Sequence, residues 1–210
     1  MKNQTILHSL RHELVSTVQA VGAEFRNLDW ESKKVYLNWL SQTYYYVQHT
    51  TCFIALMAAR WGPHNREKQY QALDFLKGES AHDLLLVDDM KVFKSNISDF
   101  AEFPETQLFY QNQYYLIEHV SPAAQLGYAF FLEGIASTQA SHVYERIKTA
   151  YGPNAGTFLR VHGEEDPDHF QKGLLILESF NNEELLAIEK SLRQSAFLYS
   201  SILNRIQASK

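Results

Sequence analysis

The sequence predicts an all-α fold, organised as one domain over residues 1–210 and built as a bundle of seven or eight helices. Apolar residues recur with the helical period over almost the whole chain. Breaks are few, because the 210 residues include only 9 glycines and 5 prolines. Apolar residues make up 45% of the composition, which is sufficient for a large core.

Two long helices are predicted in the N-terminal part of the chain. The first covers residues 4–25 and carries an apolar stripe: Ile6, Leu10, Leu14, Val18 and Val21. Asp29 is a suitable N-cap for the second helix, which extends to residue 60. Trp61-Gly62-Pro63 then ends this helix, since glycine and proline both interrupt helical structure.

The middle of the chain is predicted to hold two further helices and the longest loop. The third helix covers residues 66–93, with Gly78 as the place for a bend. Residues 94–103 contain turn residues without a period, so we expect a loop there. Pro104 opens a fourth helix that ends near residue 120, in keeping with the preference of proline for the first helical turn.

The C-terminal part is predicted to hold the remaining helices. Ser121-Pro122 has the pattern of an N-cap followed by proline at the first helical position, and its helix runs to residue 151. Gly152-Pro153 breaks this helix, and the next one begins at residue 154. Asn182 is a suitable N-cap for the last helix, and two glutamates follow it, where they complement the helix dipole.

Charge and cysteine content exclude several classes of protein. The formal net charge is -5 and no basic cluster occurs, which argues against nucleic acid as a partner because phosphate binding needs grouped Lys and Arg. Cys52 is the single cysteine, so an intramolecular disulfide is excluded and a reducing compartment is expected. No apolar run approaches the roughly 18 residues of a membrane span, and the first residues do not resemble a secretory signal. We therefore expect a cytoplasmic protein without a membrane partner.

Glu79 and His82 are the first two candidate metal ligands. They lie in LKGESAHDLLLVDD as an i, i+3 pair, which shares one face of a helix. The apolar run that follows indicates that this helix is buried over much of its circumference. Carboxylates and histidines that project into a bundle from several helices are how di-iron and di-manganese sites are built.

Glu133 is the third candidate, in the apolar segment GYAFFLEGIAS. A carboxylate in such surroundings must be paired, bound to metal, or neutral. The alternative to a metal site is a buried ion pair with an arginine. Gly134 beside it indicates a helix crossing or the close approach of another backbone.

His162, Asp166 and His169 complete the set, in the segment RVHGEEDPDHF. Their i, i+4, i+7 spacing places them on one face of a helix. Pro167 conflicts with a regular helix, because it lacks an amide proton and its ring clashes with the carbonyl group of Gly163. Two outcomes fit the pattern: a kinked helix, or a new helix that starts at Pro167 with Asp166 as its cap.

At these residues the chain resembles the heme-oxygenase-like di-iron oxidases and oxygenases, which share their fold with heme oxygenase, TenA thiaminase and pyrroloquinoline-quinone synthase. The di-iron members place a glutamate and a histidine on one helix, a glutamate on a second, and His-x-x-x-Asp-x-x-His on a third. All six positions are filled here in that order. The segments TYYYVQHT (43–50) and LGYAFFLEG (126–134) also resemble the family, and the similarity covers residues 40–177.

The resemblance implies a heme-oxygenase-like bundle that binds two iron ions, or manganese. Its implied ligands are Glu79, His82, Glu133, His162, Asp166 and His169. The implied activity is that of a non-heme di-iron oxidoreductase, which activates O2 and oxidises a small organic substrate: a carboxylate-bearing molecule, an amino acid or an amine. Two Fe(II) ions and three carboxylates would leave about one positive charge, which favours a substrate carboxylate near the metals. Dimers are common in this fold, so a homodimer is open.

Four further residues are expected to line a substrate pocket or to hydrogen-bond a metal ligand: His49, Tyr45, Tyr46 and Phe130. His49 and the two tyrosines stand in the first of the segments that resemble the family, and Phe130 stands in the second. A histidine in such a position is able to fix the orientation of a ligating carboxylate. The alternative is that these residues belong to an aromatic core.

Other functions within the same fold stay open. TenA thiaminases use a cysteine later in the chain, whereas Cys52 lies on an early helix. Heme oxygenase uses an N-terminal histidine as its iron ligand; His8 and His12 are present here, but their surroundings do not otherwise resemble that motif. The alternatives to a di-iron enzyme are therefore a heme-binding protein and a non-catalytic TenA-like binding or regulatory module without metal.

Overall fold

The computed structural model describes the backbone of residues 2–210 and the side chains of residues 4–164 and 170–210. The helices are α1 (Lys2–Arg26), α2 (Lys33–Val47), α3 (Thr50–Trp61), α4 (Arg66–Gly78), α5 (His82–Val92), α6 (Pro104–His119), α7 (Ala124–Tyr151), α8 (Thr157–Ile176) and α9 (Asn182–Gln207). Short 3-10 turns join some of them: η1 (Gly62–Asn65), η2 (Ile97–Asp99), η3 (Pro153–Ala155) and η4 (Leu177–Ser179). The described backbone contains no strand, so the predicted all-α class is confirmed. None of the helices described is both long and apolar enough to span a membrane.

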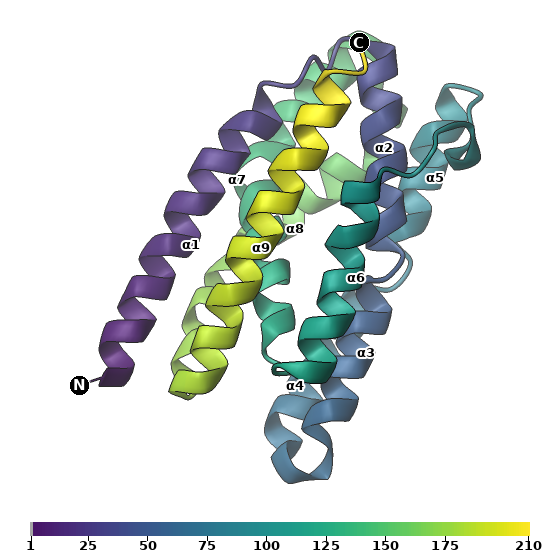
Figure 1. Cartoon of the computed structure of the whole chain (residues 1–210). Helices are drawn as coiled ribbons and strands as arrows, with labels where there is room; N and C mark the ends of the chain where they lie inside the picture. Colours follow the sequence, from purple (N-terminus) through teal and green to yellow (C-terminus); the bar gives the residue numbers. More distant parts are fainter. Residues whose placement is uncertain (1) are drawn as a thin grey trace.

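α7 is the helix around which the bundle is arranged. It contacts α1, α8 and α9, and more weakly α6 and α3 (Figure 1). α1 and α9 run side by side, and α6 packs against α2, α3 and α9 (Figure 1). The interior holds large aromatic side chains: Trp30, Tyr36, Phe53, Phe109, Tyr128 and Phe131. Complete burial of a side chain such as Phe stabilises the fold by about 1.5–3 kcal/mol, so these residues anchor the helices to one another.

The helix predicted over residues 29–60 is divided in two. Its first half, α2, begins at Lys33 with Ser32 as the N-cap, a few residues after the predicted start. The backbone N–H of His49 bonds to the carbonyl oxygen of Tyr46, three residues earlier, at 3.1 Å. This bond tightens the end of α2, and α3 starts in a new direction.

The helix predicted over residues 66–93 is also divided, and here the division affects the candidate site. Ala81 has a φ of 69°, which lies in the left-handed region that an α-helix does not contain. Glu79 therefore caps the end of α4, and His82 begins α5. The two residues do not share the face of one helix, as the i, i+3 spacing predicts, but stand on either side of a turn.

Asp89 joins α5 to the beginning of α8. Its carboxylate accepts hydrogen bonds from the backbone N–H groups of Thr157 at 2.8 Å and Phe158 at 3.0 Å. The side chain is fully buried, and burial raises the pKa of Asp89 despite the two backbone bonds, which lower it. The carboxylate thus supplies the cap that Gly156, the N-cap residue of α8, has no side chain to provide.

Gly127 lets α7 approach α9 closely. A Cβ atom at this position would lie 2.8 Å from the backbone nitrogen of Leu192 and 2.9 Å from the Cβ atom of Ser191, and would collide with the carbonyl oxygen of Ile188. Backbone atoms cannot move aside as a flexible side chain can. The contact between the two helices therefore requires glycine.

Gly127→Ala is expected to lower the free energy of unfolding by about 1–3 kcal/mol, because the new methyl group overpacks the contact between α7 and α9. Gly78→Ala is the matched control, since nothing lies within 4 Å of a Cβ atom there. We expect the control to be neutral or to stabilise by up to about 1 kcal/mol through the less flexible unfolded chain. Urea denaturation of both variants measures the difference, and equal effects would contradict the close approach.

Candidate metal centre

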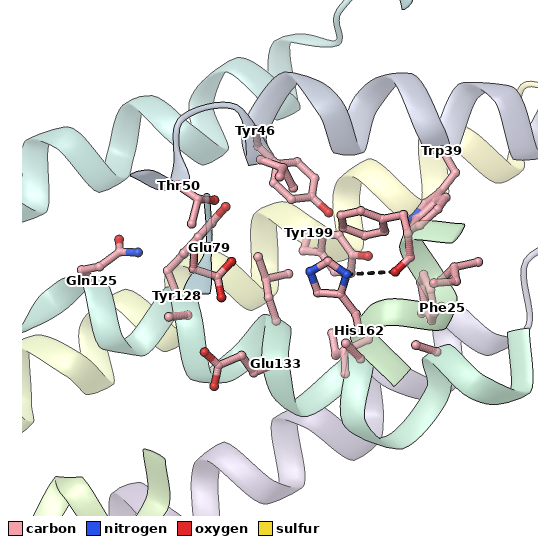
Figure 2. Close-up of a pocket in the computed structure, with 18 of the residues that line it drawn as sticks. Phe25, Trp39, Tyr46, Thr50, Glu79, Gln125, Tyr128, Glu133, His162 and Tyr199 are labelled. Atoms are coloured by element: carbon pink, nitrogen blue, oxygen red, sulfur yellow. Dashed lines mark hydrogen bonds between the residues drawn. The ribbon is translucent and has the colours of Figure 1, made fainter. Parts of the chain in front are cut away.

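A cavity of about 100 Å³ lies inside the bundle, next to α7 and α8. Its walls are mostly aromatic and aliphatic: Phe25, Trp39, Tyr46, Phe75, Leu132, Phe158 and Tyr199. Its polar lining consists of Thr50, Glu79, Gln125, Tyr128, Glu133 and His162 (Figure 2). A largely apolar cavity with a few convergent polar groups is the usual form of a small-molecule site.

Glu79, His82 and His162 come together although they belong to different elements. One ligand atom from each lies within 4.8 Å of the other two. Nδ1 of His82 is 3.5 Å from Oε2 of Glu79, and the ring centroids of the two histidines are 4.9 Å apart. Atoms that share one metal ion at about 2 Å are at most about 4 Å apart, so small side-chain rotations would close the site. Two histidines and one carboxylate form the donor set that non-heme Fe(II) oxygenases use.

The ring of His162 is held in a defined orientation. Nδ1 donates a hydrogen bond of 2.9 Å to the carbonyl oxygen of Phe158, one helical turn earlier (Figure 2). The ring also lies 4.1 Å, between centroids, from the ring of Phe158. A histidine that donates through Nδ1 carries its lone pair on Nε2, which is then the atom that binds a metal.

Glu133 projects from α7 into the same cavity and is buried. Its Oε2 atom has no hydrogen-bond partner among the described residues, and the alternative of a buried arginine pair is not found there. Burial, and then the negative charge of Glu79, raise the pKa of Glu133 to about 8. A cation between the two carboxylates would reverse this effect, because it stabilises the ionised form.

The structure places four of the six predicted ligands at the candidate site. Glu79, Glu133 and His162 line the cavity, and His82 is grouped with Glu79 and His162. Asp166 and His169 lie outside the residues whose side chains the structure describes. The two outcomes for Pro167, a kink or a new helix, fall on the same segment and stay predictions.

The four predicted pocket residues lie in different parts of the structure. Tyr46 lines the cavity of the candidate site. Tyr45 and His49 are not among the described residues that line this cavity or the second one described below. The Tyr45 hydroxyl donates to the carbonyl oxygen of Phe100 at 2.8 Å, in the segment before α6.

His49 is directed at α6 because it stands in the break between α2 and α3. Its Nδ1 is 2.9 Å from the Tyr114 hydroxyl, and its ring stacks on that of Tyr110 at 4.1 Å between centroids. Burial lowers the pKa of His49, so the neutral imidazole is favoured in this aromatic setting. These contacts agree with the alternative that His49 belongs to an aromatic core, and a role of His49 beside the metal ligands stays a prediction.

Phe130, the fourth pocket residue, lines a second cavity of about 170 Å³. The surface of this cavity is mostly apolar, with walls that include Met57, Trp61, Leu126, Ile176 and Phe180, although Gln71, Glu133 and Lys172 also line it. It shares Phe75 and Glu133 with the first cavity, so the two meet beside the candidate site. The sequence did not indicate it, because its walls come from helices far apart in the chain.

Comparisons with known proteins bear on the family of this chain. A family model described as an iron-containing redox enzyme matches residues 37–197. A solved domain of unknown function with a heme oxygenase-like fold, from Shewanella denitrificans, superposes with a TM-score of 0.80 and 17% identity over 95% of this chain and 91% of that one. A TenA homolog from Pseudomonas syringae superposes with a TM-score of 0.74 and 13% identity over 94% and 92%. Such low identity establishes the fold alone, and no curated protein matches the chain by sequence.

The raised pKa of Glu133 predicts how the stability of the metal-free chain depends on pH. Between 4.5, the ordinary carboxyl pKa, and about 8, the folded chain keeps a proton on Glu133 that the unfolded chain has released. The free energy of unfolding should therefore fall by up to about 1.4 kcal/mol per pH unit as the pH rises through this window, and the decrease should stop above it.

Urea denaturation of the wild type and of Glu133→Gln over this pH range measures the effect. Glutamine has nearly the same shape and does not titrate, so its profile should lack this part of the slope. Parallel profiles for the two proteins would contradict a raised pKa at Glu133.

Proposed function

This chain belongs to the family of iron-containing redox enzymes, and from that premise we propose that it is a non-heme di-iron oxidoreductase. It binds two iron ions, activates O2 and oxidises a small organic molecule. The observation that carries the proposal is the grouping of Glu79, His82 and His162 beside the buried carboxylate of Glu133. The donor set by itself suits iron, manganese and several other metals, and the family favours iron.

Glu79, His82, Glu133 and His162, together with Asp166 and His169, would hold the two ions. Iron bound there supplies one-electron redox chemistry and open coordination positions for O2. The aromatic walls of the cavity keep bulk water away from the reaction, which strengthens the electrostatic interactions within it. Glu133 holds its proton while no cation is near, so metal uptake below about pH 8 should release that proton.

The substrate is a small organic molecule with an apolar part. Two Fe(II) ions and the three carboxylates of Glu79, Glu133 and Asp166 leave about one positive charge, which favours a carboxylate or another electron-rich group near the ions. The adjoining apolar cavity of about 170 Å³ would take a hydrocarbon portion. An apolar cavity of about 150 Å³ is known to hold benzene, so a chain or ring of about six carbon atoms is the right size.

The same dimensions do not favour heme. The two cavities, of about 100 and 170 Å³, are each smaller than the roughly 300–1,000 Å³ of sites that hold drug-sized ligands. A heme-binding protein and a non-catalytic module remain outcomes that metal analysis would reveal. A homodimer and manganese in place of iron are further proposals that the same purified protein would test.

Anaerobic titration with Fe(II), followed by metal analysis, is expected to give close to two irons per chain, and the loaded protein should consume O2. The His162→Ala variant should bind at least one iron ion fewer, because it lacks a neutral nitrogen ligand of an ion with few protein donors. His142→Ala is the matched control, since this histidine is exposed on α7, and it should retain both ions.

Unchanged iron binding in His162→Ala would exclude this residue as a ligand. A sharp Soret band after heme loading would support the heme-binding alternative. A folded protein that takes up no metal under any of these conditions would leave the non-catalytic module.

A further inference from the structure

Gln125 presents an unsatisfied amide to the cavity of the candidate metal centre. The side chain is fully buried, it lines the cavity, and neither Nε2 nor Oε1 has a hydrogen-bond partner in the described part of the chain. Gln125 lies on the side of Glu79 away from His162, and Thr50 and Tyr128 also line the cavity (Figure 2). The cavity therefore has a second polar end, separate from the candidate ligands.

In the other buried glutamines, Gln42 and Gln113, both the amide nitrogen and the amide oxygen have hydrogen-bond partners. Nε2 of Gln113 donates to the Ser195 hydroxyl at 3.2 Å, and Oε1 accepts from the Ser191 hydroxyl at 3.1 Å. Gln42, equally buried, uses its amide in the same way, accepting from the backbone N–H of Phe103 and donating to the carbonyl oxygen of Ala101. Burying an amide without partners is costly, so the exception at Gln125 indicates a ligand that supplies them.

The surroundings of Gln125 define the kind of ligand. Its amide offers one acceptor and two donors, so the complementary group must both donate and accept. The described lining of this cavity contains no lysine or arginine, and its charged side chains are the carboxylates that the proposed metals would occupy. A charged group at this end would therefore be buried without a counter-ion, whereas an uncharged group would not incur that cost.

We propose that Gln125 is a substrate-binding residue that recognises an uncharged group with an adjacent donor and acceptor, such as a carboxamide. Thr50 and Tyr128 contribute further hydroxyl groups to the lining of the same cavity. This assignment deepens the proposed function and rests on it only in calling the ligand the substrate, because the interaction itself needs no metal. The substrate then spans the cavity, with its oxidised atom near the carboxylates and its uncharged polar group at Gln125.

Binding of simple probes to the metal-free protein tests the proposal. The probes are hexanamide, which donates and accepts, methyl hexanoate, which only accepts, and hexanoate, which is charged. Ligand-observed NMR should show that hexanamide binds more tightly than the other two. Gln125→Leu, of similar volume, should lower the affinity for hexanamide at least about tenfold. It should change the affinity for methyl hexanoate much less, because two hydrogen bonds are lost only with the amide.

Thermal unfolding separates a binding role from a structural one. Gln125→Leu should raise the Tm of the unliganded protein by about 2–4 °C, since it replaces an unpaired buried amide with an apolar side chain. Gln113→Leu is the matched control and should lower the Tm, because it removes satisfied hydrogen bonds and leaves Ser191 and Ser195 without their partner. Opposite signs for the two variants are the expected result.

Three outcomes would overturn the proposal. A Gln125→Leu variant that is less stable than the wild type would show that the amide is already bonded within the protein. Equal binding of hexanamide to both proteins, or binding of no probe at all, would show that Gln125 contacts no such ligand and that water alone satisfies it. Tight hexanamide binding that depends on Gln125, in a protein that takes up no iron, would confirm this subsite and overturn the di-iron function instead.

Discussion

The bond between Asp89 and the first turn of α8 is the contact on which the candidate centre depends. α5 has 11 residues, which is too short to be stable in isolation, so tertiary contacts must hold it. The buried carboxylate fixes it against the first backbone N–H groups of α8, which have no partner within the helix and where the positive end of the helix dipole lies. His82 and His162 stand on these two helices, so their separation is set largely by this junction.

The polar groups that α7 buries act against the stability of the bundle. The bundle is assembled by burying apolar surface, yet α7 carries Glu133 and Gln125 into the interior. Among the residues whose side chains are described, Oε2 of Glu133 and the amide of Gln125 have no hydrogen-bond partner. Each lowers the stability of the empty protein. A site whose polar groups are satisfied only when occupied is therefore stabilised by its ligands, as linkage requires. The aromatic anchors around α7 offset the cost.

The parts of the fold that follow from periodic apolar patterns were predictable, and the parts that follow from single backbone angles were not. α1, α6, α7 and α9 are close to the predicted ranges because their stripes are long. The division between α4 and α5 depends on the left-handed conformation of Ala81, which alanine seldom adopts and which no residue type in KGESAH signals. The contact of His49 with Tyr114 was likewise not predictable, because it depends on the break between α2 and α3.

The turn that divides α4 from α5 also links the two cavities to the candidate ligands. Phe75 lines both cavities, and its carbonyl oxygen accepts a hydrogen bond from the backbone N–H of Glu79 at 3.3 Å. A molecule that displaces the Phe75 ring therefore acts on the same turn of helix that carries the carboxylate of Glu79, a candidate metal ligand. Thermodynamic coupling is reciprocal, so a substrate that favours one position of α4 would alter the affinity for metal by the same factor that metal alters the affinity for substrate.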